Sequence, residues 1–192
     1  EISACLVGSE MCIRDSTSGI DYADIGSDEM RAIYAKAGVT ALGREGEVLA
    51  ERVQTLARLP LKAEPGERFI YSLSIDVLGR LVEVWSGMPL DAFVRSRILT
   101  PLGMKDSGFE LMADQRPRLV TLHQEKDAVV SPMTENQSGM NPNFPARTMT
   151  YFSGGGGMSG TTADYARFLQ LFLNGGELDG VRLVSRKTVE LM

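Results

Sequence analysis

The stretch from residue 65 to residue 83 constrains the fold more than any other, because a turn, an extended run and a helix follow one another within it. Pro65 and Gly66 are turn formers, and the aromatic and β-branched run at residues 69–71 favours extended backbone. From there, apolar residues recur at a spacing near 3.6, which predicts a helix over residues 72–86. Its apolar positions are Leu73, Val77, Leu78, Leu81, Val82 and Trp85.

Tyr71 lies immediately before the predicted start of this helix. Ser72 or Ser74 can cap the first turn, because a serine hydroxyl accepts hydrogen bonds from backbone N–H groups that lack a partner there. These N–H groups and the positive end of the helix dipole stabilise negative charge. A phenol at this point is therefore well placed to share its proton.

Helical periodicity recurs along the rest of the chain. Helices are predicted over residues 28–36, 46–59, 90–99 and 164–174, and a last one begins after Ser185. Short connectors between helices are typical of one layer of packed helices.

Between residues 109 and 152 the periodicity fades and four prolines interrupt the sequence. Short strands are expected at residues 119–122 and 128–130, with loop around them. Long loops in a compact domain are usually functional or mobile. A hairpin turn is expected at residues 178–181.

Composition narrows the function classes. The 192 residues carry a net charge of −5 without a basic block, so nucleic acid is not an expected partner. No apolar run reaches the roughly 20 residues that span a bilayer, so no membrane span is expected. The sequence gives no basis for assigning a cellular compartment.

Several blocks resemble the serine β-lactamase-related family of class C β-lactamases, D,D-peptidases, D-aminopeptidases and family VIII carboxylesterases. The block Pro-Gly-Glu-Arg-Phe-Ile-Tyr-Ser, followed by Asp-Val-Leu-Gly, resembles the family's second motif. Later blocks that agree in order and spacing lie at residues 86–90, 101–107, 154–168 and 174–189. The resemblance implies a partial serine β-lactamase/transpeptidase-like fold of the α+β class. We expect mainly its helical lobe with long loops, and most of the antiparallel sheet missing.

Residues 1–16 do not resemble this family. They resemble translated sequencing-adapter read-through, as found in metagenomic assemblies, and both cysteines lie there. We interpret residues 1–16 as extraneous and residues 17–192 as a partial domain; the alternative is an unusual native N-terminus. Without the first segment the chain has no cysteine for a disulfide or a metal site.

The resemblance implies a mechanism with three parts. A Ser-x-x-Lys helix supplies the nucleophile, a Tyr handles a second proton, and a Lys-Thr-Gly-like strand positions the substrate. No serine here has a lysine three residues on, and the sequence at residues 187–189 lacks the glycine of the third part. The chain thus carries one part of three, and we expect the polypeptide as given to be inactive. An incomplete sheet would also leave helix faces uncovered, so marginal stability is expected.

Tyr71 is the expected catalytic residue, with the implied role of relaying a proton between nucleophile and leaving group; the alternative is an aromatic that holds the helix start. Class C β-lactamases carry a substrate-contacting Asn two residues later, where this chain has Leu73. Leucine cannot hydrogen-bond an amide, so a substrate contact at Leu73 would favour esters.

The glycine run is expected to form the wall of the substrate cleft at Gly155, Gly156 and Gly157, or else to be a plain connector. His123 is the only histidine, and we expect it to be a solvated surface residue rather than part of a Ser-His-Asp triad. No metal site and no cofactor are expected.

These observations predict a fragment of a serine hydrolase that acts through an acyl-enzyme, most simply a carboxylesterase. The expected partner of the intact parent is a small-molecule ester or amide. Two alternatives stay open. The parent could be a β-lactamase, D-aminopeptidase or D,D-peptidase, or the chain could be a non-catalytic, penicillin-binding-like module.

Overall fold

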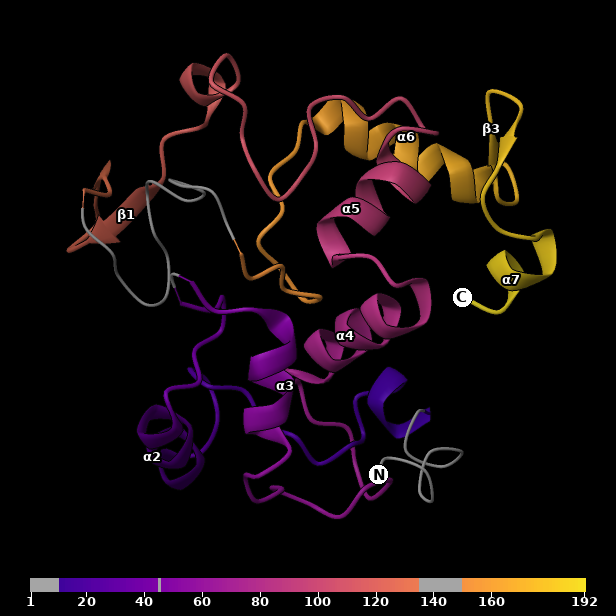
Figure 1. The fold of residues 1–192 in the computed structure, drawn as a ribbon. Coiled ribbons are helices and arrows are strands. Elements are labelled where there is room, and N and C mark those ends of the chain that lie inside the picture. The colour runs from indigo at the N-terminus through magenta and orange to yellow at the C-terminus, as the bar shows by residue number, and fades with distance from the viewer. Residues whose placement is uncertain (1–10, 45, 135–149) are drawn as a thin grey trace.

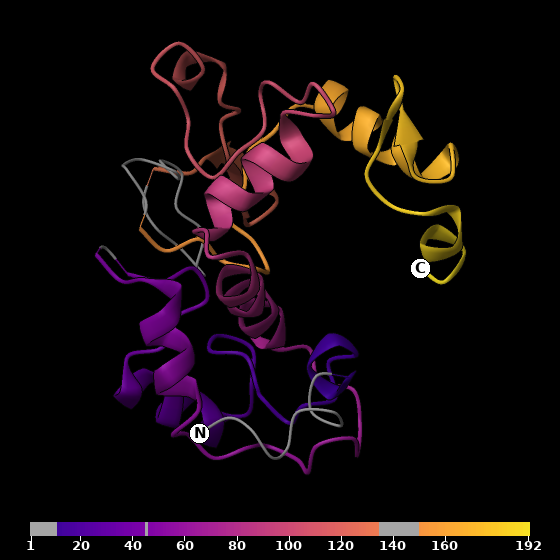
Figure 2. The same ribbon diagram turned by 45° about the vertical axis from the view of Figure 1, so that its right-hand side comes forward.

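The computed structural model describes residues 11–44, 46–134 and 150–192. Helices α2 and α3 lie at one end of the molecule, α4 lies centrally, and α5 leads from it toward α6 (Figure 1). In both ribbon views α7 and the C-terminus lie apart from α2 and α3 (Figure 2). After a short helical stretch at residues 11–14, the helices are α2 (Asp28–Ala37), α3 (Leu49–Leu56), α4 (Ser74–Ser86), α5 (Leu90–Val94), α6 (Thr162–Leu173) and α7 (Arg186–Glu190), with a 3-10 turn at Arg116–Arg118.

Local sequence signals account for most helix ends. The Ser27 hydroxyl accepts a hydrogen bond from the backbone N–H of Met30 and so caps α2. Gly38 ends that helix in the left-handed conformation, with φ of 72°, which glycine adopts without strain. Thr161 caps α6 and Ser185 caps α7 in the same way as Ser27. The predicted helix at residues 90–99 is α5 continued by a wider π-helical turn, Arg95–Leu99.

The inner face of α4 differs in part from the predicted apolar stripe. Its buried residues are Ser74, Asp76 and Gly79, whereas the Trp85 side chain is 69% exposed. Asp76 and Gly79 face the loop before α6, whereas Ser74 faces Ser18. Periodicity therefore located the helix, and its predicted positions Leu73, Val77 and Val82 do pack against the core clusters, but Trp85 lies outside them.

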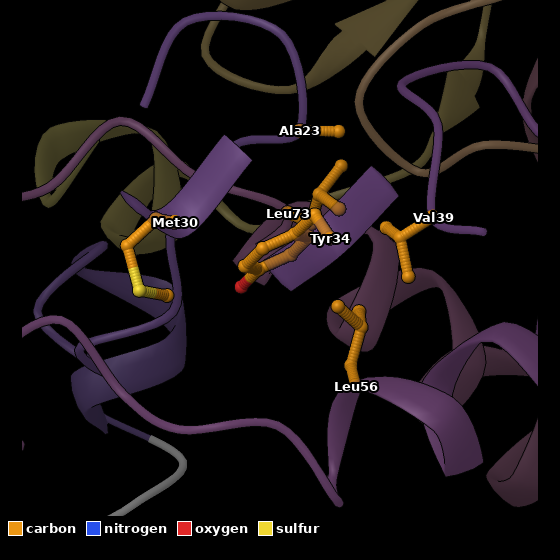
Figure 3. Packing of buried hydrophobic residues seen from close by; sticks show 6 residues of the cluster. All are labelled: Ala23, Met30, Tyr34, Val39, Leu56 and Leu73. Atoms are coloured by element: carbon orange, nitrogen blue, oxygen red, sulfur yellow. The ribbon is translucent and has the colours of Figure 1, made fainter. Parts of the chain in front are cut away.

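Three apolar clusters form the core. The first cluster packs α2 and α3 against the start of α4, and Figure 3 shows the Tyr34 ring beside Leu73. The second joins the π-helical turn, α6 and the C-terminal hairpin, and the third joins α3, α5 and the loop before α6. The buried members of the first cluster are Ala23, Met30, Tyr34, Val39, Leu56 and Leu73.

Sheet structure in the described residues is limited to two antiparallel hairpins. The first pairs β1 (His123–Lys126) with β2 (Val129–Pro132), and the second pairs β3 (Glu177–Leu178) with β4 (Val181–Arg182). The expected turn at residues 178–181 is confirmed. The strand expected at residues 128–130 was placed too early, because Ala128 has φ of 62° and forms the turn itself. The small sheets confirm the expected partial α+β fold.

No helix among the described residues is long and apolar enough to cross a membrane.

Candidate functional site

Tyr71 lies on an extended segment that ends at the start of α4. Side chains alternate along it: Phe69 is 68% exposed, Ile70 is buried and Tyr71 is 57% exposed. The backbone N–H of Ile70 donates to the carbonyl oxygen of Ser16 at 2.8 Å, which ties the segment to the loop before α2. The phenol of Tyr71 is thus presented at the surface.

The ring of Tyr71 stacks on the ring of Tyr22. The two ring centroids are 5.2 Å apart and the planes are inclined by 27°. Burial raises the pKa of the Tyr22 phenol above its ordinary value, and the neighbouring Tyr71 and Asp76 raise it further. Tyr22 therefore keeps its proton more strongly than a free tyrosine, and its ring restricts where the Tyr71 ring can lie.

A chain of serine hydroxyls lies at the start of α4. The Oγ atoms of Ser18 and Ser74 are 2.7 Å apart, and those of Ser72 and Ser74 are 2.6 Å apart. Ser72 Oγ also accepts a hydrogen bond from the backbone N–H of Ser74, but the N-cap residue of α4 is Leu73 and no side chain caps the helix, so the expected serine cap is wrong. All three residues are buried, and together they join the loop before α2 to the first turn of α4.

Leu73 does not occupy the position expected of a substrate contact. Its side chain is 0% exposed and packs in the first cluster against Tyr34 and Leu56 (Figure 3). Alternation alone would place residues 71 and 73 on the same side, but the backbone leaves the extended conformation at Leu73, the residue before α4, where φ is −73° and ψ is 13°. The leucine therefore turns into the core, and the expected substrate contact at Leu73 is wrong. The position still offers no polar group.

Gly155, Gly156 and Gly157 line a groove of about 500 Å³ beside α4. Tyr71 is not among its lining residues, although Ile75, four residues later, is. The structure thus places the three glycines at a groove that also includes Ile75, in the first turn of α4, and does not include Tyr71. The groove is lined by Ile75, Leu78, Gly79, Val82, Leu90, Val94, Phe109 and residues 153–158.

Asp76 is a polar residue of this region that the sequence pattern did not single out. Its carboxyl is 2% exposed, and Oδ1 accepts a hydrogen bond from the Tyr151 hydroxyl at 2.9 Å. Burial raises the pKa of Asp76, while hydrogen bonds from Ser153, Tyr151 and the Gly154 backbone partly oppose that rise. The signal that could have identified Asp76 from the sequence is an acidic residue within an otherwise apolar helix pattern.

Arg52 continues the buried polar contacts. Its guanidinium is fully buried, lies 5.1 Å from the centroid of the Tyr151 ring, and donates to Glu47 at 2.6 Å and to the carbonyl oxygen of Thr40. Burial alone would raise the pKa of Glu47, but the hydrogen bond and charge of Arg52 outweigh it and lower that pKa. Tyr151 thus contacts both the Arg52–Glu47 ion pair and Asp76.

The described residues contain no group of three or more His, Cys, Asp or Glu side chains that could hold a metal ion. His123 is exposed on β1, where its Nδ1 lies 3.0 Å from the carbonyl oxygen of Thr121. This position fits a surface histidine.

The chain resembles known proteins along most of its length. Residues 16–192 match the family described as Beta-lactamase. The chain is 37% identical over 139 residues to Protein Rv1367c of Mycobacterium tuberculosis, a match that covers 71% of this chain and 33% of that protein. It is 32% identical over 165 residues to Esterase EstB of Burkholderia gladioli, covering 80% of this chain and 41% of EstB.

A solved structure gives the same result at the level of the fold. EstCE1, described as a hydrolase with promiscuous acyltransferase activity, superposes with a TM-score of 0.80 at 26% identity. The superposition covers 95% of this chain and 49% of EstCE1. The chain therefore spans between a third and a half of the length of these relatives, and over that length it belongs to the beta-lactamase family.

Proposed function

We propose that the chain is part of a serine hydrolase that works through an acyl-enzyme, and that its parent hydrolyses carboxylic esters. The observation that carries this proposal is the phenol of Tyr71, exposed at the start of α4 and stacked on Tyr22. The similarity to proteins described as an esterase and a hydrolase supports the same reaction class.

The proposed chemistry gives each group a defined task. A serine outside this chain attacks the ester carbonyl, and its hydroxyl proton passes by way of Tyr71 to the departing alkoxide, which leaves as the alcohol. Water then attacks the acyl-enzyme and releases the acid, while its proton returns to the serine oxygen by the same route. Tyr71 is the expected catalytic residue in both half-reactions.

Esters are proposed over amides because the proteins that the chain resembles include Esterase EstB and a hydrolase described as having acyltransferase activity. Position 73 gives no support for amides, because its leucine is fully buried in the first cluster and offers a substrate no polar group.

The test uses the intact gene product, with the segments that flank this chain restored. We expect it to hydrolyse p-nitrophenyl butyrate and to lose activity by about 10²- to 10⁴-fold in Tyr71→Phe, the range typical of a lost proton-transfer group. Tyr165→Phe is the matched control, because Tyr165 is also exposed, at 60%, and also stacked on an aromatic ring.

Two results would overturn the proposal. An intact gene without a Ser-x-x-Lys segment would favour the non-catalytic binding module, and an unchanged rate in Tyr71→Phe would remove the phenol from the mechanism. For the chain as given, no turnover of p-nitrophenyl esters or nitrocefin is expected, and a measurable acylation burst would contradict this.

A further inference from the structure

Three hydrogen-bond donors converge on the carboxyl of Asp76. They are the Tyr151 hydroxyl, 2.9 Å from Oδ1, the Ser153 hydroxyl and the backbone N–H of Gly154. All three come from one short segment that follows more than seventy residues later in the chain. A carboxyl that is 2% exposed has little water to replace these donors, so its orientation and theirs depend on each other.

The backbone of the same segment touches α4. A Cβ atom added to Gly154 would lie 2.1 Å from the carbonyl oxygen of Ile75, well inside any allowed contact. A Cβ atom added to Gly79 would lie 3.2 Å from the Cα of Gly154. Glycine at residue 154 is therefore what allows the loop to come within hydrogen-bonding reach of Asp76.

The ring of Tyr151 is also held in place, by Arg52. Arg52 lies over its ring at 5.1 Å from the centroid, and Arg52 is fixed by Glu47 through two hydrogen bonds of 2.8 and 2.6 Å. Tyr151 is itself only 2% exposed. The hydroxyl thus reaches Asp76 from a ring whose place is set independently.

We propose that Asp76 is a positioning residue that fixes the glycine segment (residues 153–157) against the first turns of α4. The segment forms one wall of the groove, and Asp76 lies five residues after Tyr71. Asp76 thereby sets the distance between that wall and the Tyr71 segment. Its relevance to substrate binding depends on the proposed function, but the contact itself does not.

The test is the exchange of glycine amide protons in the chain labelled with [15N]glycine. The chain has 20 glycines, and Gly154→Ala and Gly155→Ala serve to assign the two resonances of interest. Asp76→Asn removes the negative charge and replaces one accepting oxygen by an amide nitrogen that cannot accept, so the hydrogen bond from Gly154 should weaken and its proton resonance should move upfield. Its exchange should accelerate at least about tenfold, as expected for local opening.

Asp164 offers a matched control at another helix start. It is 7% exposed, and its Oδ2 accepts hydrogen bonds of 2.8 Å from the Asp106 backbone N–H and the Ser107 hydroxyl. Asp164→Asn should therefore accelerate exchange near Gly103 and Gly108 and leave Gly154 and Gly155 unchanged. Asp76→Asn should instead accelerate exchange at Gly154 and leave exchange near Gly103 and Gly108 unchanged.

The two alanine variants test the close approach. Gly154→Ala removes the Gly154 signal but should accelerate exchange at Gly155, whereas Gly155→Ala should leave exchange at Gly154 unchanged, because its Cβ would lie 3.7 Å or more from its neighbours. If Asp76→Asn unfolds the chain, all glycine resonances collapse, and Tyr151→Phe then provides the test. That variant removes one donor and keeps the ring beside Arg52, and the Gly154 exchange should still accelerate.

Unchanged Gly154 exchange in Asp76→Asn, or in Tyr151→Phe where the first variant unfolds, would overturn the inference. So would equal effects of Gly154→Ala and Gly155→Ala. None of these measurements involves hydrolysis, so their failure is distinct from a failure of the intact parent to cleave esters.

Discussion

The surroundings of α4 and the C-terminal part of the chain, from α6 to α7, are held together by different interactions. Around α4, buried polar groups such as Arg52, Ser74 and Asp76 bond to one another across distant parts of the sequence. Between the π-helical turn, α6 and the last hairpin the contacts are mainly apolar and the ion pairs are exposed, although the buried Asp164 at the start of α6 accepts hydrogen bonds from Asp106 and Ser107. Water can replace an exposed contact but not a buried one, so single substitutions should matter most near α4.

The largest difference is expected between two arginines. Arg52→Ala removes a fully buried partner of Glu47 and should lower the free energy of unfolding by about 3–5 kcal/mol. Arg182→Ala breaks the pair with Glu177, in which both side chains are more than 40% exposed, and should cost no more than about 1 kcal/mol. Urea unfolding followed by circular dichroism measures both. Similar costs for the two variants would refute the proposed difference between the regions.

A second pair compares two leucines. Leu73→Ala should cost about 2–5 kcal/mol, because the side chain is 0% exposed in the first cluster. Leu173→Ala, at the end of α6 where the side chain is 79% exposed, should stay within about 0.5 kcal/mol of the parent. The same unfolding measurement applies. A small cost for Leu73→Ala would restore that residue as a surface contact with substrate.

These comparisons also show what the sequence could predict. Helices with clear periodicity and serine caps, such as the one that Ser27 begins, were placed to within a few residues, because those signals are local. The α5 helix was predicted as one regular element, since nothing in its sequence marks a change to π-helical hydrogen bonding at Arg95. The strand at Ala128 was misplaced because a turn with positive φ at a non-glycine residue has only a weak signature.

The candidate site was predictable only in part. Tyr71 and the glycine run were predicted from a motif and its spacing; the structure places the glycines at a groove, and the catalytic role of Tyr71 stays a prediction. The contact between Asp76 and Tyr151 was missed because it joins residues 75 positions apart and no local pattern records it. Leu73 was misplaced because a motif position gives the residue type but not the direction of the side chain.

Two carboxyls near α4, those of Glu47 and Asp76, should contribute differently to stability as the pH changes in the acid range. The pKa of Glu47 is lowered in the folded chain, so its contribution to stability is present above the unfolded pKa of 4.5 and is lost as the pH falls through the folded value. The pKa of Asp76 is raised, so its ionisation weakens the fold as the pH rises above the unfolded value of 3.8 toward the folded one.

Glu47→Gln should therefore become more costly, relative to the parent, as the pH rises through the acid range. Asp76→Asn should become less costly over the same range. Unfolding in urea at a series of pH values from about 2.5 to 7 measures both trends, because the Glu47 trend lies below the ordinary carboxyl pKa values and the Asp76 trend lies above them. Trends of the same sign in the two variants would contradict the opposite directions of the two shifts.

The smallest effects are expected at the helix caps of the C-terminal part. Thr161→Ala removes the hydroxyl that accepts the Asp164 backbone N–H at 3.2 Å and should cost about 1 kcal/mol, or a decrease in Tm of about 2–4 °C. Ser185→Ala removes the cap of a five-residue helix with no buried residue and should shift Tm less. A larger shift for Ser185→Ala than for Thr161→Ala would mean that α7, rather than α6, secures this end of the chain.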